Sequence, residues 1–105
     1  MQEERVKKIM LNLKSKQIAK LKSLAHHLNP VFQIGKDGIS ENMLVDLNNY
    51  LHKHELMKVS ILNNCMLDKE EIKEILSDYF VVVQIIGNIV VLYKPNKKLP
   101  NSIEL

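Results

Sequence analysis

Tryptophan is absent from this 105-residue sequence, and cysteine and aromatic residues are scarce. The single cysteine, Cys65, cannot form an internal disulfide, and only 5% of the residues are aromatic, so the core must consist of aliphatic side chains. The chain also lacks a charged start followed by a long apolar run, which would mark a signal peptide or a membrane span. We therefore expect a cytoplasmic protein with one domain, a single core and no contact with a membrane.

Recognisable catalytic and metal-binding patterns are missing as well. The sequence contains no Ser-His-Asp arrangement, no paired carboxylates and no phosphate loop of the GK[ST] type. His26 and His27 are adjacent and point in different directions on a helix, and no Cys or carboxylate is spaced to complete a metal site. We expect His54 to pack at a helix end and Cys65 to be structural. The pattern favours a non-catalytic protein without metal, cofactor or small-molecule substrate.

The most informative stretch that is present is VFQIGKDGIS at residues 31–40, where Gly35 and Gly38 enclose Lys36. Glycines allow a sharp turn and leave backbone amides uncovered. Ser40 is a good N-cap, so the positive end of a helix would lie beside the lysine, an arrangement that binds anions. The loop could therefore hold a nucleic-acid backbone. The alternative is an ordinary strand-to-helix turn, because such short motifs also occur by chance.

Basic residues exceed acidic ones by only 15 to 12, but the two kinds are unevenly distributed. No acidic residue lies between Lys7 and Lys36, whereas acids gather at residues 70–78. A helix capped by Ser15 and running to about His27 would present a basic stripe, which suits phosphate contacts, although a solvated helix face is the alternative. Its buried side would consist of Ile18, Leu21, Leu24, Ala25 and Leu28, and its basic side of Lys16, Lys20, Lys22, His26 and His27. For His26, RNA contact and capping of the helix end are both open.

Hydrophobic periodicity and turn signals predict the remaining elements. They are a short buried strand at 31–34, a helix after Ser40, a strand at 56–62, a helix opened by the capping box of Asp68 and Glu71, and strands at 80–86 and 89–93 joined by Gly87-Asn88. Because strand-helix-strand connections are right-handed, the first two strands should be parallel. The predicted fold is α+β, a single compact domain of order α-β-α-β-α-β-β with a four-stranded mixed sheet packed with helices.

Three stretches resemble the YhbY family, the stand-alone bacterial form of the CRM RNA-binding domain: LKSLAHHLNPVFQIGKDGIS, LHKHELMKVSI and VVQIIGNIVVLYKP. They follow the order and spacing of the family over residues 13–95. The resemblance implies a fold related to the C-terminal domain of the third bacterial initiation factor and a GxxG loop comparable to that of KH domains. It further implies RNA as the partner, in particular ribosomal RNA of large-subunit precursors, and a role in ribosome assembly. We expect a monomer, with residues 1–12 as an N-terminal extension and residues 96–105 as a flexible tail.

The resemblance also implies a set of RNA-binding residues. These are Lys16, Lys20, Lys22, His26, Gly35, Lys36, Asp37, Gly38 and Lys58. Two departures from the family weaken individual contacts, because Ser60 stands where the family has lysine and Asp37 adds a negative charge to the loop. Since Tyr50, Tyr79 and Phe80 fall on apolar faces, we expect recognition of RNA backbone and shape rather than base sequence. The alternative function is a protein-interaction adaptor that docks on ribosomal or assembly-factor proteins through the apolar residues of its N-terminal arm, Val6, Ile9, Met10 and Leu13.

Overall fold

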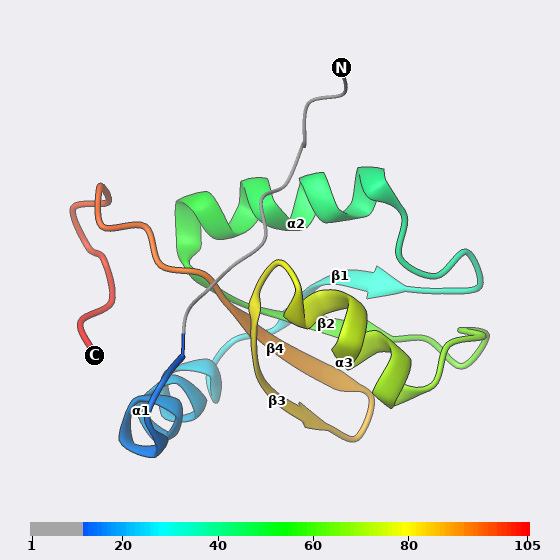
Figure 1. Ribbon diagram of the computed structural model, residues 1–105, viewed down its shortest axis with the longest axis horizontal. Helices are drawn as coiled ribbons and strands as arrows, with labels where there is room; N and C mark the ends of the chain where they lie inside the picture. Colours follow the sequence, from blue (N-terminus) through cyan, green and yellow to red (C-terminus); the bar gives the residue numbers. More distant parts are fainter. Residues whose placement is uncertain (1–11) are drawn as a thin grey trace.

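The computed structural model describes residues 12–105, so all of the predicted N-terminal extension except Asn12 lies outside the described residues. The elements follow the predicted order, which is confirmed (Figure 1). They are α1 (Ser15–Ala25), β1 (Pro30–Ile34), α2 (Glu41–His54), β2 (Leu56–Ile61), α3 (Lys69–Ser77), β3 (Val81–Ile86) and β4 (Ile89–Tyr93).

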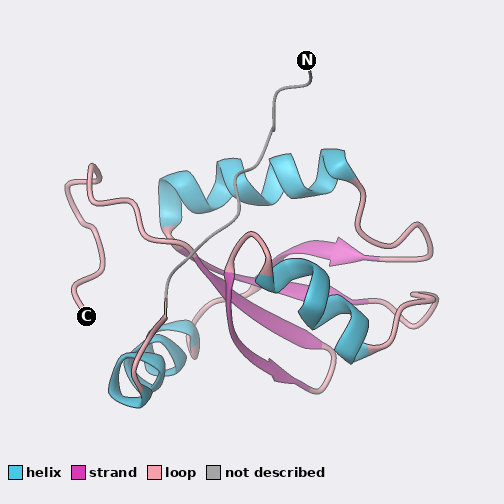
Figure 2. Cartoon of the chain, in the orientation of Figure 1, coloured by secondary structure: helices cyan, strands magenta, loops and turns pink. Residues whose placement is uncertain are grey.

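The strands form one mixed sheet in the order β1-β2-β4-β3 (Figure 2). β1 and β2 are parallel with α2 as the crossover, and β3 and β4 form an antiparallel hairpin, as the sequence predicted. The antiparallel pairing of β2 with β4 joins these two pairs. Gly87 adopts a φ of 57° in the turn that joins β3 to β4, which explains why glycine stands there. Both edge strands are irregular, because the pairing register shifts between Pro30 and Phe32 in β1 and between Val82 and Gln84 in β3.

Helices cover both faces of the sheet, and alternate strand residues separate the two cores. On one face, α2 and α3 pack on Met57 and Val59 of β2 and on Val90 and Leu92 of β4. On the other face, α1 packs in a smaller cluster on those side chains of β2, β3 and β4 that point away from α2 and α3. This second cluster contains Leu21, Ala25, Leu56, Val83, Val91 and Tyr93. The sheet is therefore the middle layer of three, with two helices on one side and one on the other.

Helix starts follow local signals in two of the three helices. The Ser40 hydroxyl accepts a hydrogen bond of 3.1 Å from the Met43 amide at the start of α2. At the start of α3, the Asp68 carboxylate accepts a hydrogen bond of 2.9 Å from the Glu71 amide, and the Glu71 carboxylate accepts one of 3.2 Å from the Asp68 amide. These two bonds confirm the predicted capping box. The expectation that Ser15 caps α1 is wrong, because Ser15 is already helical.

The shorter α1 also changes which of its residues are buried. It ends at Ala25 rather than near His27, and Leu24 and Leu28 remain 41% and 37% exposed, although we expected both on the buried side. Val31 at the start of β1 is likewise 46% exposed. The physical reason is that one helix is too narrow to cover a face of four strands. Part of this face therefore stays open.

The C-terminal segment is held against the body by Glu55, the residue that ends α2 in a left-handed conformation with a φ of 64°. Its carboxylate is 1% exposed and accepts hydrogen bonds from the Asn96 amide, the Ser102 hydroxyl and the Ile103 amide, at 2.7, 2.8 and 2.7 Å. The expectation that residues 96–105 hang loose is thus corrected. The segment lacks periodicity because one distant carboxylate, rather than a helical or strand pattern, holds it.

Of the apolar residues proposed for the adaptor function, only Leu13 lies in the described part of the chain. Its side chain is partly buried and packs against the second core cluster, the one that contains Leu21 and Ala25 of α1. The other three fall outside the described residues. Within residues 12–105, no helix combines the length and apolar character needed to cross a membrane.

Candidate nucleic-acid interface

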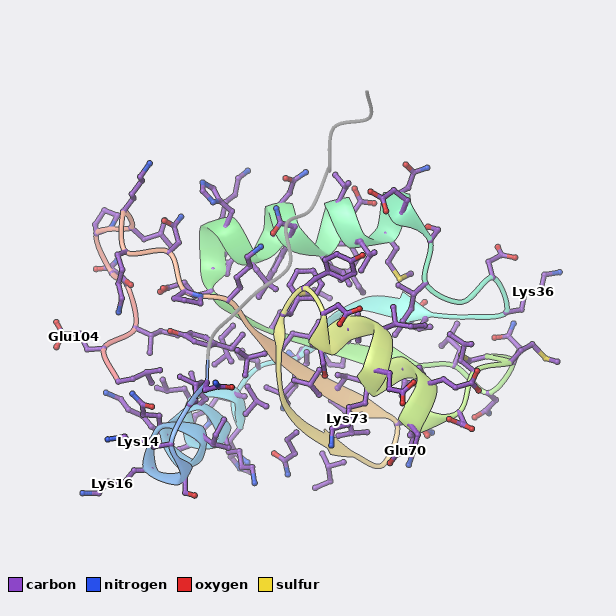
Figure 3. The ribbon with its side chains drawn as sticks, in the orientation of Figure 1. Lys14, Lys16, Lys36, Glu70, Lys73 and Glu104 are labelled. Carbon is purple, nitrogen blue, oxygen red and sulfur yellow. The ribbon has the colours of Figure 1, made fainter. Side chains whose placement is uncertain are left out.

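The GxxG loop, Gly35 to Gly38, forms a tight turn between β1 and α2. The Gly38 amide donates to the Gly35 carbonyl at 3.0 Å, and Gly38 has a φ of 68°, which side chains resist. A β-carbon at Gly38 would also lie 3.3 Å from Leu67 Cδ1. Gly35 has no positive φ, so only one of the two glycines is required by backbone conformation. Lys36 is exposed and points outward from the end of the molecule (Figure 3).

Charges around this loop do not favour anions as strongly as the sequence suggested. Lys36 is the one cation of the turn, while Asp37 beside it and Glu41 in the first turn of α2 both carry carboxylates. Ser40 already occupies the amides of Met43 and Leu44 through its side chain and its carbonyl. An anion at the loop would thus meet one positive and two negative side chains. We therefore regard the loop as a secondary contact.

A stronger candidate is a hollow of about 470 Å³ between α1 and the uncovered part of the sheet. We call it the α1 hollow. It is lined by Lys22, Ser23, Ala25, His26 and His27 of the α1 end, Lys58 of β2, Gln84 and Ile86 of β3, and Val91 of β4. Two lysines and two histidines thus converge on it, and none of the lining residues within 12–105 is acidic. Three of the predicted RNA-binding residues, Lys22, His26 and Lys58, are brought together here.

The geometry of α1 explains why only some of its basic residues reach the α1 hollow. Successive residues turn by about 100°, so Lys22 and Lys20 lie about 200° apart around the axis. Lys22 and His26, four residues apart, occupy one flank of the buried stripe of Leu21 and Ala25 and face the open sheet. The predicted stripe is therefore split, with one part at the hollow and the other on the outer side.

Lys16 and Lys20 belong to that outer part. The Lys20 ammonium donates a hydrogen bond to the Glu104 carbonyl of the C-terminal segment. Lys16 extends outward from α1, on the opposite side of the molecule from Lys36 (Figure 3). β1 separates α1 from the GxxG loop, and five residues of strand span roughly 16 Å. The predicted RNA-binding residues therefore do not form one continuous surface.

Sequence reasoning named His27 without assigning it to the interface and missed Gln84 and Ile86. Gln84 is the one polar residue in the apolar run of β3. On β2, alternation places Lys58 on the same side of the sheet as Leu56, which packs against α1. That isolated glutamine was the available signal. It could not be interpreted without knowing which face α1 leaves open.

The acidic side chains of α3 are separated from the α1 hollow by the sheet. Glu70, Glu71, Glu74 and Asp78 lie on or directly after α3, which covers the opposite face together with α2. The described residues contain no group of three His, Cys, Asp or Glu side chains placed to hold a metal ion. A polyanion at the hollow would therefore meet cations from α1 and β2, and no carboxylate among the wall residues of the described chain would oppose it.

The groups with shifted pKa values lie outside the α1 hollow and belong to the structural framework. Burial alone would raise the pKa of Glu55, but hydrogen bonds from Asn96, Ile103 and Ser102 and the charge of Lys97 outweigh it, so this pKa is lowered. Burial lowers the pKa of Lys94, whose ammonium donates to Asn48 Oδ1 at 2.7 Å. The lowered pKa of Glu55 indicates that its ionised carboxylate stabilises the fold.

Comparison with known proteins finds relatives that match most of the chain. Residues 13–94 match the model of the CRS1 / YhbY (CRM) domain. The "Probable RNA-binding protein YqeI" of Bacillus subtilis is 46% identical over 88 residues, which cover 82% of this chain and 92% of that protein. An "RNA-binding protein" of Haemophilus influenzae is 40% identical over 95 residues, covering 85% of this chain and 92% of its relative.

A solved structure is similar in both sequence and fold. The solution structure of the hypothetical protein SAV1595 from Staphylococcus aureus, named as a candidate RNA-binding protein, is 44% identical with a TM-score of 0.69. The similarity covers 82% of this chain and 92% of that one. The family match spans most of the sequence and includes α1, the GxxG loop and the strands that line the α1 hollow. The chain therefore belongs to the CRS1 / YhbY (CRM) domain family.

Proposed function

We propose that this protein is a non-catalytic RNA-binding protein that grips the RNA backbone mainly at the α1 hollow. The observation that carries the proposal is the convergence of Lys22, His26, His27 and Lys58 on one hollow, to whose lining the described part of the chain contributes no acidic side chain. Phosphates held by such side chains release condensed counterions, which gives affinity that does not depend on sequence. Lys36 in the GxxG loop adds a weaker contact at the far end of β1.

The partner we propose is ribosomal RNA in precursors of the large subunit, and the role is assistance in ribosome assembly. The names of the relatives support RNA as the partner, and the resemblance to the YhbY family supports the ribosomal part. Crosslinking the protein to RNA in growing cells, followed by sequencing of the attached fragments, tests this part. Fragments drawn mainly from large-subunit RNA are expected, and an even spread over cellular RNAs would contradict it.

The backbone contacts are tested by changing Lys22 and Lys58 together to Ala and measuring affinity for structured ribosomal RNA over a range of salt concentrations. Each lost phosphate contact should reduce the slope of log K against log salt by about 0.7–0.9, so the pair should reduce it by roughly 1.5. The matched control changes Lys69 and Lys73 on the acidic α3 to Ala, with the same loss of charge. If both double variants have the same slope and affinity, the α1 hollow does not bind phosphates.

Two further variants separate the secondary contacts. Lys36→Ala should reduce affinity less than either lysine change at the α1 hollow, because carboxylates of Asp37 and Glu41 already oppose the loop's charge.

Deletion of residues 1–10 tests the adaptor alternative. Loss of co-sedimentation with ribosomal particles while RNA affinity stays intact would favour the adaptor, and retention of both favours RNA binding by the described domain.

A further inference from the structure

The α1 hollow has an exposed apolar side chain in its lining, which backbone binding does not explain. Ile86 of β3 stands at its side with 59% of its surface exposed, whereas Ala25 and Val91 at its base belong to the core under α1 and are only 1% and 2% exposed. Phosphate gains nothing from contact with such side chains, because it is strongly hydrated and charged. A nucleobase does gain, since its faces are largely apolar. The lining thus combines a surface for a base with cations for the phosphates beside it.

Flat rings are also present in the α1 hollow, although phenylalanine and tyrosine are not. The His26 and His27 imidazoles lie edge to face, with centroids 5.3 Å apart and planes at 81°. Both side chains are exposed, so a ring face is accessible to an incoming base. Histidine is one of the residues on which unstacked RNA bases stack. By contrast, Phe32 and Tyr50 pack against the other core.

A hydrogen-bonding group completes this lining. The Gln84 side chain is half-buried at the α1 hollow and makes no hydrogen bond to any of residues 12–105. Its amide offers two donors and a carbonyl acceptor, the groups needed to pair with the edge of a base. It is contributed by β3, across the hollow from the rings on α1. A base between them would be held by its face and its edge together.

We propose that the α1 hollow takes up an unpaired RNA base, with His26 or His27 against its face, Gln84 on its edge, and Lys22 and Lys58 on the neighbouring phosphates. This inference rests on the proposed RNA-binding function and adds that the RNA presents an unpaired nucleotide at the site. A volume of about 470 Å³ lies within the range of roughly 300–1,000 Å³ typical of pockets for small organic molecules. Bases stacked inside a helix cannot enter it, whereas a bulged or looped base can.

The test compares two RNA hairpins with the same stem, one fully paired and one with a single bulged nucleotide, at one salt concentration. The bulged base is replaced by 2-aminopurine, whose fluorescence reports its surroundings. We expect the bulged hairpin to bind about tenfold more tightly, the order of one stacked base, and its fluorescence to change on binding. Gln84→Ala and Ile86→Ser should each reduce this preference severalfold by weakening binding of the bulged hairpin more than binding of the paired hairpin, because neither removes a cation.

Matched controls are Gln33→Ala and Met66→Ser, which change a glutamine and an exposed apolar side chain outside the α1 hollow. Equal binding of both hairpins by the unmodified protein overturns the inference, as does a preference that Gln84→Ala and Ile86→Ser alter no more than the controls. In both cases the proposed function stands if the double lysine variant still reduces affinity and salt slope. If the double lysine variant has the same affinity and salt slope as the unmodified protein, the proposed function itself is wrong.

Discussion

Glu55 should stabilise this fold more than any other single carboxylate in the described part of the chain. Its carboxylate is buried and accepts three hydrogen bonds from the C-terminal segment, two of them at Oε2 and one at Oε1. A hydrogen bond to a charged group contributes about 1.5–3 kcal/mol. In Glu55→Gln one oxygen becomes an amide nitrogen that cannot accept, so at least one bond is lost and the others weaken. We expect the free energy of unfolding to fall by about 2–4 kcal/mol.

Urea and thermal unfolding followed by circular dichroism measure this loss. For a domain of this size it corresponds to a decrease in Tm of roughly 10–20 °C. Glu74→Gln on the exposed face of α3 is the matched control and should change stability by less than about 0.5 kcal/mol. The decisive comparison repeats Glu55→Gln in a chain that ends after Pro95. There the three donors are gone, and the substitution should cost less than about 1 kcal/mol. An equal cost with and without the C-terminal segment would refute our explanation.

The same contacts predict how stability depends on pH. Because the pKa of Glu55 in the folded protein is lowered from its ordinary 4.5, its contribution is complete above that value and is lost as the pH falls through the folded pKa. The unmodified protein should therefore lose stability on acidification more steeply than Glu55→Gln does. Parallel curves for the two proteins below pH 4.5 would contradict the assignment of this carboxylate as the anchor.

Three further substitutions test local features of the fold. Gly38→Ala should lower the free energy of unfolding by about 1–2 kcal/mol, because Gly38 has a positive φ. Gly35→Ala should lower it by less than about 0.5 kcal/mol. Similar losses for both variants in urea unfolding would contradict the assignment of Gly38 as the glycine that the backbone requires. Asp68→Ala should cost about 1 kcal/mol by removing the cap of α3, and no change in Tm would show that the cap is dispensable. Leu47→Ala should cost about 2–5 kcal/mol, since the side chain is fully buried between α2 and the sheet, and a smaller loss in urea would mean that the core closes around the gap.

Features set by neighbours along the chain could be predicted from the sequence. Ser40 and Asp68 cap helices through residues three positions away, and Gly87-Asn88 forms the hairpin turn through its own conformation. The right-handed crossover then placed β1 beside β2. These predictions succeeded because each depends on interactions within a few residues or on a general rule of chain topology.

The candidate site could be predicted only in part, because it depends on long-range packing. Periodicity identified the basic residues of α1, but it could not show that Lys22 faces the open sheet while Lys20 meets the C-terminal segment. Gln84 lies about sixty residues from α1 in the sequence, and nothing local links them. The same holds for Glu55, whose partners begin at Asn96. Residues joined only by the tertiary fold leave no periodic signal.

The irregular register of both outer strands affects how copies of this protein behave at high concentration. A straight, fully hydrogen-bonding border on a sheet is a template for another chain, and proline or a bulge interrupts that template. Pro30 removes an amide donor at one border, where the register also shifts, and the shift between Val82 and Gln84 interrupts the other. We therefore expect concentrated solutions of the protein to resist aggregation through its sheet edges.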